Sequence, residues 1–206
     1  MANELEDIIV KSHNLFMKYG IKSVTMDDVA RELGISKKTL YLHVKDKNDL
    51  VEKMFEFEKD CAHKKFEFLE SNDFNAIDQL FEADKMFLML LKDHNPAAFY
   101  DLKKYYPVIY TKLTQIRRTR ISDFFRGNIA KGISEGLYRP ELNGEIIAKL
   151  HVSRIEGVID GDVLTVEEFT SGKWIKELLS YHIRGLATPK GIEYFESKLN
   201  DYNSQF

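Results

Sequence analysis

The sequence has few residues that interrupt or cross-link a chain. Among 206 residues there are four prolines, 11 glycines and one cysteine, Cys61. A single cysteine excludes an intrachain disulfide and is typical of proteins from a reducing compartment. Because helix-breaking residues are so sparse, the chain favours long helices. We therefore predict an all-α fold, without strands, in a cytoplasmic protein.

The chain also has no long hydrophobic run and no excess of positive charge. Its longest apolar run, Met86 to Leu91, is too short to span a bilayer, and the first residues lack a secretion leader, so we expect no membrane partner. The net charge of −3 gives no global sign of nucleic-acid binding. Locally, however, four lysines lie between Gly34 and Lys47, against Asp46 alone. Such a patch is enough to contact phosphates.

The stretch from residue 25 to residue 44 predicts a helix-turn-helix. Thr25 and Ser36 are good N-cap residues, since their side-chain oxygens can accept hydrogen bonds from free backbone N–H groups. Gly34 can adopt the left-handed conformation that ends a helix, so the chain can reverse there. The apolar residues of the first helix recur at the spacing of one buried face: Met26, Val29, Ala30 and Leu33. A second short helix then follows at residues 36–43.

The second helix of this motif has a polar outer face that suits DNA recognition. A helix fits the major groove of B-DNA, where hydroxyl, amino and imidazole groups can bond to base edges. We predict that the residues facing DNA are Ser36, Lys37, Lys38, Thr39, Tyr41 and His43. We place Thr25 and Lys47 on phosphates, since Lys47 lies in the first turn of the next helix. The alternative is a solvated helix face in a plain packing unit.

The motif resembles the DNA-binding head of the tetracycline-repressor (TetR) family. The matching positions are Thr25, Val29, Ala30, Gly34, Ile35, Ser36, Leu40, Tyr41, His43, Lys47 and Leu50. Val44 stands where the family usually has phenylalanine, a difference that affects only local packing. The resemblance covers residues 1 to about 62. It implies a homodimeric regulator whose C-terminal helices bind a small-molecule effector, which alters the spacing of the two DNA-reading heads.

We predict two domains. Residues 1–62 form the DNA-binding domain, a three-helix head, and residues 63–206 form a helical domain for regulation, ligand binding and dimerisation. One helix begins near Asp46 and continues into the second domain as a rigid lever. Apart from the helix-turn-helix, apolar periodicity, glycines and prolines predict helices at 5–19, 50–69, 77–91, 99–106, 108–135, 143–159, 166–186 and 191–199.

Aromatic residues are concentrated in the middle of the chain. Fourteen of the 25 lie between Phe55 and Phe125. Aromatic walls between helices suit a pocket for an apolar small molecule. From this pattern and the family resemblance, we expect the effector pocket to include Phe66, Phe81, Phe87, Phe99, Tyr100, Tyr106, Tyr110 and Phe124. The alternative is that these residues form an ordinary helical core.

The two helices predicted at 143–159 and 166–186 are more apolar than one buried face requires. The surplus suggests a second apolar surface, covered by the same helix pair of another subunit in a four-helix bundle. We expect this dimer interface to include Ile147, Leu150, Ile155, Trp174, Ile175, Leu178, Tyr181 and His182. Burial inside the monomer is the alternative.

Together these features predict a ligand-responsive homodimeric repressor that reads a partly palindromic operator in double-stranded DNA through the helix at 36–43. The two recognition helices of a dimer would lie about 34 Å apart, one turn of DNA. Two alternatives stay open: a ligand-independent DNA-binding or architectural protein, and an enzyme with a vestigial head. The six histidines show no metal-ligand spacing, and the sequence has no glycine-rich phosphate loop. We therefore predict no catalytic residues, no metal and no cofactor.

Overall fold

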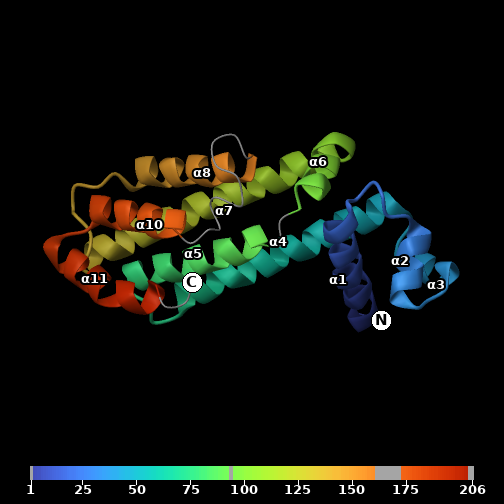
Figure 1. The fold of residues 1–206 in the computed structure, drawn as a ribbon, viewed down its shortest axis with the longest axis horizontal. Helices are drawn as coiled ribbons and strands as arrows, with labels where there is room; N and C mark the ends of the chain where they lie inside the picture. The colour runs from blue at the N-terminus through green and yellow to red at the C-terminus, as the bar shows by residue number, and fades with distance from the viewer. Residues whose placement is uncertain (1, 93–94, 161–172, 204–206) are drawn as a thin grey trace. The chain divides into compact units, whose positions relative to one another are not determined.

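The computed structural model describes residues 2–92, 95–160 and 173–203. These residues are almost entirely helical (Figure 1). Outside helices and loops, they form only an isolated antiparallel bridge between Tyr138 and Ala187. The predicted all-α fold is therefore confirmed. Within this described part of the chain, no helix is both long and apolar enough to cross a membrane.

The helix bounds are α1 (Ala2–Tyr19), α2 (Met26–Leu33), α3 (Lys37–His43), α4 (Lys47–Ser71), α5 (Ala76–Lys92), α6 (Pro96–Tyr105), α7 (Pro107–Ser134), α8 (Gly144–Asp160), α10 (Lys173–Leu186) and α11 (Pro189–Asn203). α11 is longer than the predicted 191–199. Its first turn is stabilised by the hydroxyl of Thr188, which accepts a hydrogen bond from the Gly191 backbone N–H at 3.2 Å. The predicted start of α10 near residue 166 lies outside the described residues.

Three of the described helices begin at prolines, and one of them is α11, which begins at Pro189. Pro96 lies in the first turn of α6, where the N-cap residue Asn95 accepts a hydrogen bond through Oδ1 from the Ala97 backbone N–H at 2.8 Å. α6 therefore starts earlier than the predicted residue 99. Pro107 is the first residue of α7. Proline suits these positions because a backbone N–H there has no partner within the helix.

The helices form two compact units. The first holds Met1–Lys64 and Asp93–Ile116, and the second holds Lys65–Lys92 and Arg117–Phe206. α4 and α7 each contribute residues to both units. The first unit contains the residues of the predicted DNA-binding domain and adds α6 with the first part of α7.

In the first unit, α1, α2, α3 and α4 share one hydrophobic core. Its completely buried residues include Phe16, Ile21, Leu40, Leu50 and Met54. Val29, on the predicted inner face of α2, is 1% exposed, and Val44 is 2% exposed. The smaller side chain at position 44 therefore still belongs to the core of the head.

The second unit has an apolar core with a satisfied polar network inside it. The side-chain amide of Asn128 donates to the Ala76 carbonyl at 2.7 Å and to Gln79 Oε1 at 3.0 Å. Gln79 in turn donates to the Leu69 carbonyl at 3.0 Å. The hydroxyl of Tyr138 lies 3.1 Å from the Ala76 carbonyl oxygen and 3.2 Å from Asn128 Oδ1. These bonds join α4, α5 and α7 to the segment that follows α7, so the polar groups stabilise a defined packing.

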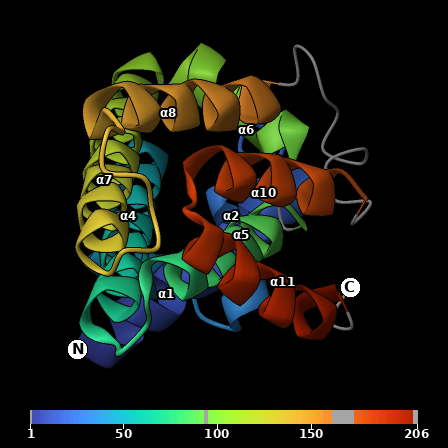
Figure 2. The ribbon, with the colours of Figure 1, turned by 90° about the vertical axis from the view of Figure 1, so that its left-hand side faces the viewer.

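The C-terminal helices complete the second unit. Figures 1 and 2 both show α10 between α8 and α11. Ile183 of α10 and Phe195 of α11 are completely buried, and the Phe195 ring stacks on Phe81 of α5 with centroids 5.7 Å apart. The core therefore holds α5, α10 and α11 together.

Gly132 and Gly127 provide a matched test of this packing, because both lie in α7 but differ in surroundings. A Cβ atom on Gly132 would lie 2.0 Å from a ring carbon of the buried Tyr138, whereas nothing lies within 4 Å of a Cβ on Gly127. We expect Gly132→Ala to lower the free energy of unfolding by about 1–3 kcal/mol through overpacking. Gly127→Ala should raise it by up to about 1 kcal/mol through helix propensity. Urea denaturation measures both values, and equal stability of the two variants would contradict the packing.

Candidate nucleic-acid interface

Local caps fix the ends of α2 and α3, as the sequence predicts. The hydroxyl of Thr25 accepts from the Asp28 backbone N–H at 3.2 Å, and Asp28 Oδ2 accepts from the Thr25 backbone N–H at 2.9 Å, which completes a capping box. Hydrogen bonds from Thr25 hold the pKa of the Asp28 carboxyl below its usual value. Gly34 ends α2 with φ +68°, and Ser36 Oγ then accepts from the Thr39 backbone N–H at 3.0 Å.

α3 buries one face and exposes the other. Leu40 is completely buried, whereas Lys37 and Lys38 are exposed and Tyr41 is 42% exposed. The ammonium group of Lys37 lies 2.8 Å from Asp27 Oδ1, and this hydrogen bond raises the pKa of Lys37. The predicted cationic face of α3 therefore lies open to solvent.

Leu42 is an exposed residue of α3 that the sequence analysis missed. Its side chain is 77% exposed. The spacing contained the signal, because a residue two positions after the buried Leu40 points to the opposite side of a helix. An apolar side chain at such a place can contact a thymine methyl group in the major groove.

Thr39 and His43 lie at the edge of this face and are partly buried. The hydroxyls of Thr39 and Ser36 are 2.8 Å apart. His43 Nε2 lies 3.6 Å from Glu4 Oε1 of α1. Their contact with DNA stays a prediction.

Lys47 also has partners within the head. Its ammonium group donates to the Val24 carbonyl at 2.6 Å, approaches the Lys22 carbonyl at 3.4 Å, and lies 5.7 Å from the centre of the Phe16 ring. Burial lowers the pKa of Lys47. The side chain therefore holds the connection between α1 and α2 in place, while its contact with a phosphate stays a prediction.

The N-cap residue of α6 and a residue within α6 bind the end of α1 and the same connection. Asn95 donates through Nδ2 to the Met17 carbonyl at 2.6 Å, and Asp101 Oδ2 accepts from the Lys22 backbone N–H at 2.7 Å. The partners are 78 and 79 positions apart in the sequence. Sequence reasoning had no signal for these contacts, although both residues position the head.

Comparison with known proteins identifies the family. Residues 8–54 match the family described as bacterial regulatory proteins, tetR family. An HTH-type transcriptional regulator of Staphylococcus aureus strain MRSA252 is 30% identical over 142 residues, which cover 55% of this chain and 77% of the relative. The chain belongs to the TetR family. It is a DNA-binding transcriptional regulator of that family.

Other comparisons concern shorter segments or the fold. A regulator of S. aureus strain USA300 is 30% identical over 86 residues, covering 42% of this TetR-family chain and 46% of the relative. A TetR transcription regulator from Haloarcula marismortui has a TM-score of 0.73 at 16% identity, covering 91% of this chain and 100% of that one. A gamma-butyrolactone receptor has a TM-score of 0.69 at 13% identity, and the match covers 100% of this chain and 99% of the receptor chain. The two solved structures support the fold.

The eight aromatic residues predicted for the effector pocket lie in different units. Phe66, Phe81, Phe87 and Phe124 belong to the core of the second unit or pack against it. Phe99, Tyr100, Tyr106 and Tyr110 lie in the first unit, where Tyr100 is 59% exposed. Their part in a pocket stays a prediction.

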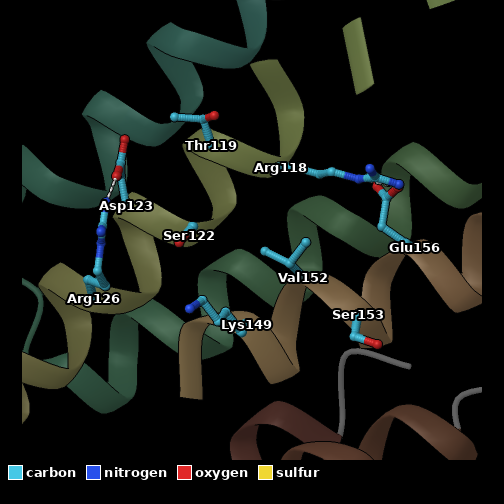
Figure 3. A pocket seen from close by; sticks show the side chains of 9 residues that line it. All are labelled: Arg118, Thr119, Ser122, Asp123, Arg126, Lys149, Val152, Ser153 and Glu156. Atoms are coloured by element: carbon cyan, nitrogen blue, oxygen red, sulfur yellow. Dashed lines mark hydrogen bonds and ion pairs between the residues drawn. The ribbon is translucent and has the colours of Figure 1, made fainter. Parts of the chain in front are cut away.

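A groove of about 590 Å³ opens between α7 and α8 of the second unit (Figure 3). Its walls are mostly polar. Arg118 lies 2.7 Å from Glu156, and Arg126 pairs with Asp123. These charged side chains already have partners, and none of the predicted aromatic residues lines the groove.

The residues predicted for a dimer interface also differ in exposure. Leu150 is 64% and Tyr181 is 83% exposed, and Ile146, which the prediction omitted, is 57% exposed. Ile155 is buried, and Ile147, Leu178 and His182 are partly buried. The side chains of Trp174 and Ile175 lie outside the described ones. Ile146 and Leu150 therefore expose apolar surface on α8, and Tyr181 exposes it on α10.

A substitution tests the internal role of Lys47. Lys47→Met removes the charged hydrogen bond to Val24, so we expect the free energy of unfolding to fall by about 1–3 kcal/mol. Lys38→Met, at an exposed site, should change it by less than about 0.5 kcal/mol. Urea denaturation followed by circular dichroism compares them. If the Lys47 variant is as stable as the Lys38 variant, the internal contact does not contribute to the free energy of unfolding.

Proposed function

We propose that this TetR-family regulator is a ligand-responsive homodimeric repressor that reads a partly palindromic operator through α3. The observation that carries the proposal is the exposed outer face of α3, where Lys37, Lys38, Tyr41 and Leu42 project from a helix whose ends are capped. Cationic and hydroxyl groups bind phosphates and base edges, and Leu42 adds an apolar contact. Ser36, Thr39 and His43 complete this face in the proposal.

The homodimer in this proposal forms through α8 and α10. Ile146, Leu150 and Tyr181 expose apolar surface on these two helices. Clusters of exposed apolar side chains mark interaction surfaces, and a symmetric dimer places two recognition helices on two half-sites of DNA. This arrangement explains why the operator would be palindromic.

Ligand response is the third part of the proposal. A gamma-butyrolactone receptor has a similar fold, which supports a small-molecule effector for the second unit. A ligand shifts a conformational equilibrium only if it binds one state better than the other. Because α4 and α7 contribute to both units, a change in the second unit can reach the head through continuous helices. The proposal assigns no catalytic residue or cofactor, and it places the protein in the cytoplasm beside DNA.

DNA binding can be tested on fragments from upstream of the gene for this protein. We expect saturable, salt-sensitive binding that prefers one fragment. Lys38→Ala should weaken binding to that fragment by about 1–3 kcal/mol and reduce its preference over unrelated DNA. Lys37→Ala should weaken binding to all fragments and flatten the dependence of log K on log salt by about one per protomer.

Lys65→Ala is the control for this experiment, because Lys65 is an exposed lysine in the second unit. It should leave both the affinity and the salt dependence unchanged. If the Lys38 variant keeps the wild-type preference, α3 does not read bases through that residue. If the wild-type protein binds no fragment selectively, the operator-reading function is wrong.

Dimer formation can be tested by substitution on the exposed surface. Leu150→Glu and Tyr181→Glu bury a charge if α8 and α10 form the interface, so each should shift the mass in solution from dimer towards monomer. Met89→Glu is the control, since Met89 is 66% exposed but lies on α5. Size exclusion with light scattering measures the masses. If both variants form dimers with the same affinity as the wild type, the interface does not include Leu150 and Tyr181.

A further inference from the structure

A cluster of ionisable side chains lies inside the second unit, away from the surface groove. Asp84 comes from α5, His151 and Arg154 from α8, and His182 from α10. They surround a cavity of about 10 Å³, which is room for roughly one water molecule. α7 contributes Phe125, whose ring stacks on the His151 imidazole with centroids 3.6 Å apart. The remaining lining is apolar and consists of Leu80, Ala83 and Leu179.

The two histidines are neutral in this environment. His151 is 4% exposed, and its Nε2 lies 2.6 Å from His182 Nε2. Burial is the main reason that the pKa of His182 falls to about 3, and it lowers the pKa of His151 as well; Arg154 lowers both further. A neutral imidazole offers one donor and one acceptor. The pair can therefore satisfy each other at one nitrogen each, which leaves the second nitrogen of each ring to other partners.

Two buried nitrogen atoms of the cluster lack a hydrogen-bond partner among the described residues. Within the described part of the chain, His151 Nδ1 and Arg154 Nε are buried without a hydrogen-bond partner. The guanidinium of Arg154 has five N–H donors. The carboxylate that faces it is Asp84, whose oxygen lies 3.7 Å from the Arg154 Nη2, longer than a hydrogen bond. Burial raises the pKa of Asp84, which weakens this carboxylate further as a counter-ion.

A cation would be unfavourable here because Arg154 already carries a positive charge. Burial also favours the neutral form of both histidines, because it lowers the pKa of each. A ligand that supplies acceptor oxygens with negative charge would accept a hydrogen bond from Arg154 Nε and, in the tautomer that carries its proton on Nδ1, from His151. An apolar tail would match the leucine, alanine and phenylalanine side chains around them.

We propose that the cluster of Asp84, His151, Arg154 and His182 is the polar end of the effector site, and that the effector is a small carboxylic acid with an apolar tail. Its carboxylate binds Arg154, and its tail packs between α5 and α10. Because the cavity of about 10 Å³ is smaller than either group, side chains around it must move to admit the ligand. Asp84 competes with the ligand for Arg154. This inference rests on the proposed ligand response, but binding at the cluster does not depend on DNA.

The test uses the whole protein chain labelled with ¹⁵N. Two small molecules, butyrate and butyramide, serve as the ligand probes. They have the same tail, and only butyrate carries a charge. A hydrogen bond to a charged group contributes about 1.5–3 kcal/mol, so butyrate should bind at least about tenfold tighter than butyramide. Butyrate should also shift the Nε–H resonance of Arg154, which is buried in the free protein.

Three variants connect the binding to the cluster. Arg154→Gln should abolish the preference for butyrate. Asp84→Asn removes the competing carboxylate and keeps its shape, so it should bind butyrate at least as tightly as the wild type. Arg126→Gln is the matched control, because Arg126 lies on α7 at the surface groove and should leave binding unchanged. Circular dichroism verifies that each variant is folded.

The proposal is overturned if butyrate and butyramide bind equally, if neither binds, or if a folded Arg154→Gln variant keeps the preference. Loss of binding in Asp84→Asn would overturn it too, since Asp84 rather than Arg154 would then hold the ligand. DNA release by butyrate is measured separately. Binding at the cluster without release from DNA would keep the site and reject the ligand-responsive repressor. Absence of DNA binding would leave the result at the cluster intact.

Discussion

Backbone groups at helix ends need hydrogen-bond partners, and the head of this protein depends on the side chains that supply them. Thr25 and Ser36 cap the helix starts next to them in the sequence. Lys47 and Asn95 instead reach carbonyls of the α1–α2 region from other helices. An unpartnered backbone group away from water costs about as much as a lost hydrogen bond. The position of the segment that joins α1 to α2 therefore depends on contacts made outside the helix-turn-helix.

Local sequence signals predicted what local physics determines. The caps, the turn at Gly34 and the inner face of α2 each depend on residues within a few positions of one another, so one sequence was enough to predict them. Most helix positions also follow from local signals, namely apolar spacing within a helix and breakers at its ends, although α6 and α11 begin before their predicted starts. Leu42 is absent from the predicted DNA-facing residues, although its position two residues after the buried Leu40 contains the signal of its exposure.

Long-range pairing determines what the sequence could not predict. We expect His182 at the dimer interface, and the structure adds a contact that the sequence does not indicate: its ring lies against His151, 31 positions away. Phe99 and Tyr106 were grouped with Phe124 as one aromatic set, yet the compact units separate them. Periodicity gives the face of a helix but not the identity of the element that covers it. For this reason the fold followed from the sequence more completely than the site.

The buried polar groups of the second unit lie in two different environments. Around Asn128 and Tyr138, donors and acceptors are matched, which is what a stable core requires. In the cluster around His182, Arg154 Nε and His151 Nδ1 remain without partners among the described residues, at a cost that apolar side chains would avoid. Both environments lie in the same helical unit, so general packing does not explain the difference. A binding partner with acceptor oxygens does, because it would accept the hydrogen bond of Arg154 only when it is present.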